Sequence, residues 1–176
     1  GLLSVILLFF MAYTTLDIFK KRADAAQNDI AHISNQNYQN SFGIRVLDWI
    51  IASQVLKEKP IFGEGLGDFK MATQKALTQD SFGLDANNRS FLEAHHFHNQ
   101  YLMLAVQGGF VGLFLMCLLF FHLLKLPIKI REFKEISILG LSVILVGFIA
   151  EPLWMLQFPN TLFLFIVSIS IVASKD

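Results

Sequence analysis

The sequence predicts an all-α, polytopic helical membrane protein with a mostly helical cap on one side of the membrane. The 176 residues are 54% hydrophobic and only 16% charged, whereas soluble domains carry about 25% charged residues. The apolar residues gather in uncharged runs, and most ionisable groups lie in one long segment between the first two runs. This composition excludes an ordinary soluble domain, a disordered chain and a fibrous protein.

Net charge and cysteine content exclude further classes of function. The formal net charge is zero, so no basic excess indicates nucleic-acid binding. The one cysteine of the sequence, Cys117, leaves no partner for an internal disulfide and no cysteine-based zinc site.

The first apolar run, residues 1–16, is expected to be a membrane helix. It is shorter than the roughly 20 residues that a helix needs to cross a bilayer. It begins at Gly1 and lacks the basic start and cleavage site of a signal peptide. We therefore expect the sequence to be a C-terminal fragment that begins inside a transmembrane helix.

Residues 17–98 are predicted to form a loop domain outside the membrane. The polar stretch 23–40 is expected to be a mobile approach segment. Helical spacing of apolar residues then predicts an amphipathic helix from about Ser41, capped by Asn40 or Ser41 and ended by Pro60.

A glycine-rich loop follows this helix, with glycine at positions 63, 65 and 67. Such a loop allows backbone to approach a ligand closely, but no βαβ unit accompanies it, so a nucleotide-phosphate site is disfavoured. Asp68 is expected to cap a short helix over 69–78. After a loop over 79–90, a helix is expected to start near Ser90 and to run through the histidines into the membrane.

Two later apolar stretches are predicted to cross the membrane. One is long enough to span the bilayer alone, and prolines divide the other into two short spans. The predicted order is a membrane helix over 1–16, the loop domain over 17–98, a membrane helix over 99–124, an internal loop over 125–135, two short membrane helices within 136–173 joined by a turn near 151–158, and a tail over 174–176.

Basic residues between the second and third spans set the predicted orientation. By the positive-inside rule this loop is cytoplasmic, which puts residues 17–98 on the other side. The basic triplet at 20–22 disagrees, but the rule is weak for loops longer than about 60 residues. The residues of the basic loop are Lys125, Lys129, Arg131 and Lys134.

The densest group of chemically active side chains is Glu93, His95, His96 and His98. Three interpretations compete: polar anchoring at the membrane interface, a metal site, or a histidine that acts as a general base. His95 and His98 would share one helical face, but the HExxH zinc pattern is absent. An imidazole with an ordinary pKa near 6.5 suits proton transfer at neutral pH.

Other polar residues allow both structural and functional interpretations. Arg45 could pair with Asp48 along its helix or hold a phosphate with its guanidinium fork, and the sequence leaves the two open. Arg89 is expected to be a solvated loop residue, and Glu151 an interfacial loop residue rather than a functional acid. The glycines at 108, 109 and 112 are expected to allow close helix packing.

One string of residues resembles a known signature. His98 and Asn99, followed by nine residues and Gly109 and then by two residues and Gly112, resemble the signature of bacterial O-antigen ligases.

Two earlier segments extend the resemblance. Residues 41–49, which contain Arg45, and residues 60–69, with their alternating glycines, resemble the large periplasmic loop of the O-antigen ligase and polymerase superfamily. The resemblance covers about residues 41–125.

The resemblance implies a multi-pass glycosyltransferase of the GT-C type in the bacterial inner membrane, of which this chain is the C-terminal part. Such enzymes move a glycan from undecaprenyl pyrophosphate to lipid A–core lipopolysaccharide in the periplasm. It implies no cofactor, metal, nucleotide sugar or nucleic-acid partner, with membrane lipids around the spans. The resemblance implies His98 as the base for the acceptor hydroxyl and Arg45 as a residue that holds the pyrophosphate. Asn99, Gly63 and Gly65 are further candidates for substrate binding. The remaining candidate members of the site are Arg89, which matches no motif of the family, His95 and Glu93.

Alternatives remain open at this level. An O-antigen polymerase or a protein O-oligosaccharyltransferase of the same superfamily differs from a ligase in its acceptor. A transporter or channel fragment and a metal hydrolase that uses Glu93 and the histidines belong to other classes.

Overall fold

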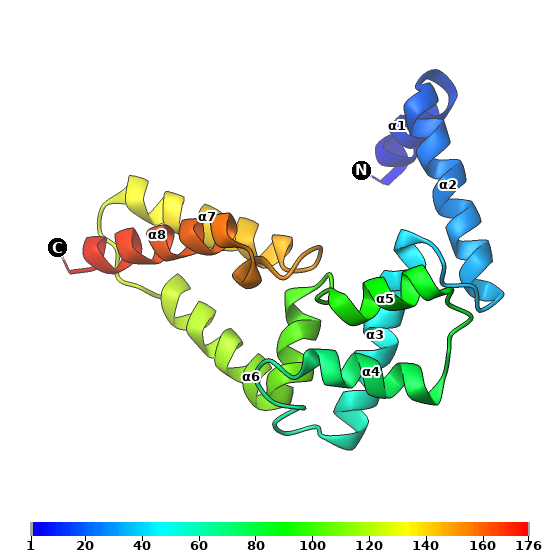
Figure 1. Cartoon of the computed structure of the whole chain (residues 1–176). Helices are drawn as coiled ribbons and strands as arrows, with labels where there is room; N and C mark the ends of the chain where they lie inside the picture. Colours follow the sequence, from blue (N-terminus) through cyan, green and yellow to red (C-terminus); the bar gives the residue numbers. More distant parts are fainter. Residues whose placement is uncertain (1, 176) are drawn as a thin grey trace.

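The computed structural model describes residues 2–175, which form helices and connecting loops with no strand among them (Figure 1). The all-α prediction is confirmed, and Gly1 and Asp176 lie outside the described residues. In chain order the elements are α1 (Leu2–Thr15), α2 (Asp17–Ser34), α3 (Ser41–Glu58), α4 (Phe69–Gln79), α5 (Ala86–Ala94), α6 (Gln100–Leu124), α7 (Arg131–Gly147), the 3₁₀ helix η1 (Leu153–Met155) and α8 (Gln157–Ala173).

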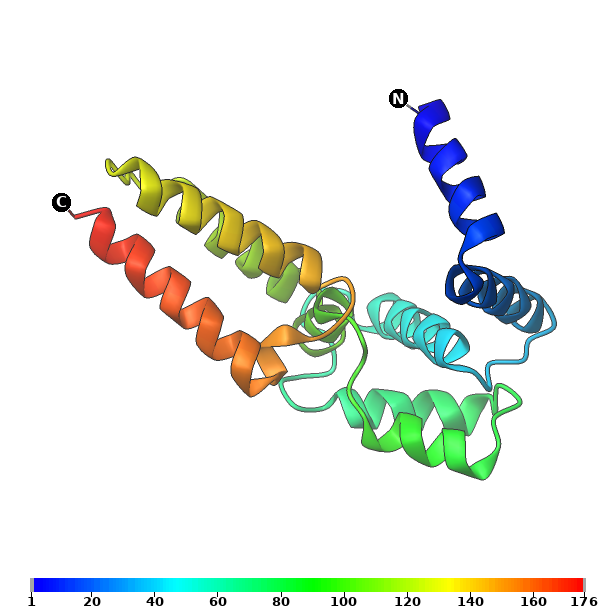
Figure 2. The same cartoon turned by 90° about the horizontal axis from the view of Figure 1, so that it is seen from above.

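The helices α1 and α2 form an arm that stands apart from the rest of the chain (Figures 1 and 2). Leu16, with extended backbone, separates them, and α2 continues to Ser34 without burying any side chain. Most of the stretch 23–40 is therefore helical, which the sequence did not indicate, and its mobility stays a prediction. Four alanines between 23 and 31 favour helix strongly enough to offset the polar composition.

A first hydrophobic core joins α3, α4 and α5 to the first part of α6. The amphipathic face of α3 is buried there, with Leu47 and Ile51 at 0% exposure. The side-chain oxygen of Asn40 accepts from the N–H of Gly43 at 2.6 Å and caps α3, and the helix ends just before Pro60. The predicted start and end of this helix are confirmed.

Two details of the cap region differ from the sequence predictions. Asp68 precedes α4 but makes no capping hydrogen bond with its side chain, because its backbone is not extended (φ −87°, ψ 12°). Helix α5 is capped by Asp85, whose carboxylate accepts from the N–H of Asn88 at 2.8 Å, and it ends at Ala94. Residues 95–99 form a non-helical connector, so no helix runs through the histidines.

Helix α6 is broken at Gly109. The backbone of this residue has φ 58° and ψ −151°, a conformation that does not occur within an α-helix. The loop after α3 enters this break: Glu64 N–H donates to Val106 O at 2.7 Å, and Phe110 N–H donates to Pro60 O at 2.8 Å. Backbone groups that the break frees are thus bonded again, as a low-dielectric environment requires. The membrane helix expected over 99–124 corresponds to α6, which carries this break inside it. That the helix crosses a membrane stays a prediction.

Two glycines make this close approach of backbones possible. A Cβ at Gly109 would collide with the carbonyls of Pro60 and Ile61, and a Cβ at Gly63 would collide with the carbonyl of Val106. Close helix packing is therefore the wrong explanation for Gly109, while a Cβ at Gly108 would meet nothing within 4 Å.

A second hydrophobic core joins the second part of α6 to α7 and α8, which lie side by side (Figure 2). Leu141 and Phe148 are completely buried in it, and the hydroxyls of Ser137 and Ser170 hydrogen bond at 2.6 Å. Among residues 2–175, one helix, Gln100–Leu124, is long and apolar enough to cross a membrane, and Gln157–Ala173 is a shorter apolar helix. Multiple membrane crossings and their orientation stay predictions.

Replacing Gly109 by alanine is expected to destabilise the full-length protein by about 1–3 kcal/mol through backbone strain alone, and further through the collision with the loop. Gly108→Ala is the matched control, since it adds the same methyl group one residue earlier into open space. Thermal unfolding of the detergent-purified proteins measures both. Equal unfolding midpoints for the two variants would contradict the proposed close contact between the loop 60–65 and the break in α6, which we call the interlock.

Candidate active site

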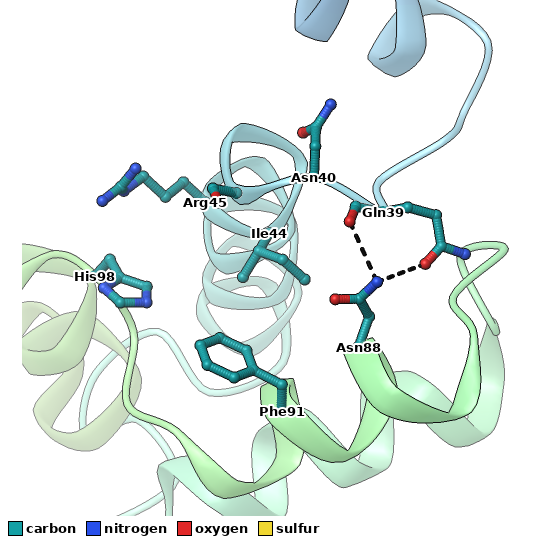
Figure 3. A pocket seen from close by; sticks show the side chains of 8 residues that line it. Gln39, Asn40, Ile44, Arg45, Asn88, Phe91 and His98 are labelled. Atoms are coloured by element: carbon teal, nitrogen blue, oxygen red, sulfur yellow. Dashed lines mark hydrogen bonds between the residues drawn. The ribbon is translucent and has the colours of Figure 1, made fainter.

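A cavity of about 460 Å³ opens between α3, α5 and the connector 95–99, and its volume is within the ~300–1,000 Å³ typical of small-ligand sites. It is lined by Gln39, Asn40, Ser41, Ile44, Arg45, Asn88, Phe91 and His98 (Figure 3). The structure thus brings together Arg45 and His98, which are far apart in the sequence.

Backbone hydrogen bonds fix the position of His98. Its N–H donates to the carboxyl group of Asp48 on α3 at 2.9 Å. The next residue, Asn99, caps α6 by accepting from Leu102 N–H at 3.1 Å, and its amide donates to Ile149 O at 3.0 Å. Asn99 does not line the cavity, so its place in the structure is that of a positioning residue.

The side chain of His98 faces a carboxylate that the sequence analysis set aside. Both carboxyl oxygens of Glu151 lie 3.2 Å from Nδ1 of His98. Because a carboxylate can only accept, this contact favours the neutral tautomer that carries its hydrogen on Nδ1 and its lone pair on Nε2. This tautomer is the one that a histidine needs in order to take a proton from a ligand.

Arg45 also approaches Glu151, with Nη2 4.0 Å from Oε1 and a side chain that is 48% exposed. The expected interfacial role of Glu151 does not describe these contacts. A signal was present in the sequence: Glu151 is the one carboxylate within the otherwise uncharged stretch 136–173. Its partners could not be found there, since they lie more than 50 positions away.

The alternative pair of Arg45 with Asp48 is not formed within the described residues. Asp48 points into the core and is 2% exposed. Burial raises the pKa of Asp48 to about 7, and the charge of Glu151 adds to the rise, while the His98 N–H and the Arg45 guanidinium act against it. One oxygen of Asp48, Oδ1, has no hydrogen-bond partner among residues 2–175, which suits a protonated carboxyl group.

His96 is a third basic side chain near Glu151, besides His98 and Arg45, with its Nε2 4.0 Å from Oε2 of Glu151. Burial, and secondly the neighbouring His98, lower the pKa of His96. His96 is therefore kept neutral at pH values where an exposed histidine begins to gain a proton.

The remaining predicted residues lie elsewhere. Arg89 pairs with Glu93 along α5 at 3.2 Å, and His95 stacks on Phe91 with ring centroids 3.9 Å apart. Gly63 and Gly65 contact the break in α6 and do not line the cavity. Within residues 2–175, no group of three or more His, Cys, Asp or Glu side chains could hold a metal ion.

The raised pKa of Asp48 predicts a pH-dependent stability. Between about pH 4 and pH 7 the folded protein keeps a proton that the unfolded chain releases, so this contribution to stability falls as pH rises through that window. Asp48→Asn cannot ionise, and its oxygen can still accept from His98. We expect the variant to gain stability relative to the parent as pH rises from about 5 to about 8, by roughly 2–3 kcal/mol.

Thermal unfolding of both proteins across this pH range measures the difference. Asp68→Asn is the control, because it makes the same change at an exposed carboxyl group that forms no capping hydrogen bond. Parallel profiles for Asp48→Asn and the parent would show that Asp48 ionises normally.

Two comparisons with known proteins found a match. The O-antigen ligase family model matches residues 1–117. An uncharacterized protein of Haemophilus influenzae is 30% identical over 148 residues, which are 80% of this chain and 36% of that protein. The chain thus spans about a third of this relative's length, and no solved structure matches it. On the family match, this chain belongs to the O-antigen ligase family.

Proposed function

We propose that this chain carries catalytic groups of an O-antigen ligase, which moves a glycan from undecaprenyl pyrophosphate to lipid A–core lipopolysaccharide on the periplasmic side of the inner membrane. The observation that carries the proposal is the His98–Glu151 pair in a chain of this family. His98 lines the same cavity as Arg45, and Glu151 contacts both residues.

His98 has the geometry of a general base. Its Nε2 would accept the proton of the acceptor hydroxyl while that oxygen attacks the anomeric carbon of the donor sugar. Glu151 would hold the Nδ1 hydrogen and stabilise the imidazolium that forms, as the carboxylate does in a catalytic triad. General-base assistance contributes about 10²–10⁴-fold to a rate.

Arg45 supplies the complementary charge. As the acceptor oxygen bonds to the anomeric carbon, the bond from that carbon to the pyrophosphate breaks, and the electron pair leaves with the pyrophosphate. A guanidinium offers several donors in a planar fork that fits phosphate oxygens. Its half-exposed position beside Glu151 leaves room for such a ligand.

A transporter fragment is the main alternative from another class, since broken helices line transport sites. The break in α6 does not support it. The freed groups around Gly109 bond to residues 60–65 of the same chain and so do not offer a site to a transported ion.

Glu151→Gln is expected to lower transfer about 10²–10⁴-fold, because the amide can donate to Nδ1 and favour the wrong tautomer of His98. His98→Ala should lose at least as much. Lipopolysaccharide gels of a deletion strain that expresses each full-length variant give the measurement, with Glu135→Gln as the control at an exposed ion pair on α7.

The same gels distinguish the members of the superfamily. A ligase deletion loses long chains from lipopolysaccharide while lipid-linked polymer persists, whereas a polymerase deletion leaves a single-repeat band. Normal lipopolysaccharide with unglycosylated proteins indicates a protein O-oligosaccharyltransferase. A normal ladder with His98→Ala would refute the assignment of the base.

Arg45→Lys tests whether Arg45 acts through the planar, bidentate geometry of its guanidinium or through its positive charge alone. Lysine keeps the positive charge but loses bidentate bonding, so we expect transfer to fall about tenfold or more, corresponding to roughly 1.4 kcal/mol of transition-state stabilisation. Steady-state transfer by the purified full-length variant gives the value. Full activity of Arg45→Lys would mean that charge alone suffices.

A further inference from the structure

We propose that a second polar cavity, between α2 and the 37–40 connector, continues the candidate active site and binds uncharged sugar residues of a glycan substrate. This inference rests on the proposed function. The cavity has a volume of about 320 Å³, and Gln39 and Asn40 line both it and the first cavity. The two cavities therefore adjoin through these two residues.

One face of α2 forms a wall of the second cavity. Its lining residues Ala25, Asn28, Asp29 and His32 follow the i, i+3, i+4, i+7 spacing of a single helical face. The helix buries no side chain, so packing does not explain this face. A small residue beside polar ones is instead suited to a ligand that lies along the helix.

The chemistry of the lining favours neutral, hydroxyl-bearing ligands. Carboxamides dominate it, and no Lys or Arg lines the second cavity among the described residues. A carboxamide both donates and accepts without a charge, as does each sugar hydroxyl. A phosphate would favour the Arg45 end instead. The carboxamides of the two cavities are Asn28, Asn37, Gln39, Asn40 and Asn88.

The amides at the junction are held in fixed orientations. The amide of Asn88 donates to the side-chain oxygen of Gln39 at 2.7 Å and to its backbone oxygen at 3.2 Å (Figure 3). The Gln39 amide donates in turn to Gly83 O, and Asn37 accepts from Gln39 N–H at 3.1 Å. Fixed donors and acceptors lower the entropy cost of binding.

The junction and the reacting groups lie on different sides of the first cavity. Figure 3 shows His98 and the Arg45 guanidinium on one side and Gln39 with Asn88 on the other. A glycan with its reacting sugar at His98 can therefore extend past Gln39 and Asn40 toward Asn28.

Asn28→Leu tests the second cavity, because it removes the amide at nearly constant size on an exposed part of α2. The matched control is Gln27→Leu, an exposed neighbour that does not line the cavity. Purified full-length protein is assayed with undecaprenyl-pyrophosphate donors that carry one or several repeat units, and with complete or truncated lipid A–core acceptors.

We expect Asn28→Leu to lower kcat/KM about threefold to tenfold for the longer glycan, as for the loss of one hydrogen bond, with little change for the shorter one. If the variant loses its preference for donors with several repeat units over donors with one, the cavity binds the donor glycan. If it loses its preference for complete over truncated lipid A–core, the cavity binds the acceptor. Asn28→Trp, which fills the cavity, should lower kcat/KM for the longer glycan further.

The proposal is overturned if Asn28→Leu and Asn28→Trp leave the preferences for donor length and acceptor length unchanged. It is also overturned if both variants lower kcat/KM equally for all substrates. His98→Ala separates this result from failure of the proposed function. If His98→Ala is inactive while the Asn28 variants keep the parent's selectivity, only the glycan cavity is refuted. If the His98→Ala protein is active, the proposed chemistry itself is refuted.

Discussion

The connector 95–99, together with Gln100 at the start of α6, joins the two hydrophobic cores, and the geometry of the site depends on these residues. On one side the His98 N–H bonds to Asp48 of α3. On the other side Asn99 and Gln100 bond to the carbonyls of Ile149 and Phe148, and the Gln100 side chain accepts from Trp154 N–H. The turn that these bonds hold is the one that carries Glu151. Loss of the connector bonds would therefore separate the base from its carboxylate.

The interlock, the contact between the loop 60–65 and the break at Gly109, is a second link between distant segments of the chain. A backbone group without a partner in an apolar environment costs several kcal/mol, so a broken helix needs a protein partner at the break. The loop 60–65 supplies it with main-chain atoms, which explains why glycines stand at 63 and 109. The glycine-rich loop approaches another backbone closely, where the sequence analysis expected a ligand.

Local patterns in the sequence predicted local structure well. The face of α3, its Asn40 cap and the division of 136–173 into two helices follow from spacing, capping chemistry and proline. The break at Gly109 and the connector could not be predicted, because each depends on hydrogen bonds to residues over 40 positions away. The same limit applied to Glu151, whose significance comes entirely from Arg45 and His98.

The buried Asp48 has a consequence for the charge of the site. Below about pH 7 Asp48 is mostly protonated, and His96 is held neutral. The charged side chains that remain beside His98 are then Glu151 and Arg45, which balance. A proton taken up by His98 would then be matched by the negative charge that develops on a leaving pyrophosphate. An ionised Asp48 would place a second carboxylate behind His98 and oppose the approach of that anion. In the proposed function, a protonated Asp48 would anchor the His98 backbone without opposing the approach of a phosphate.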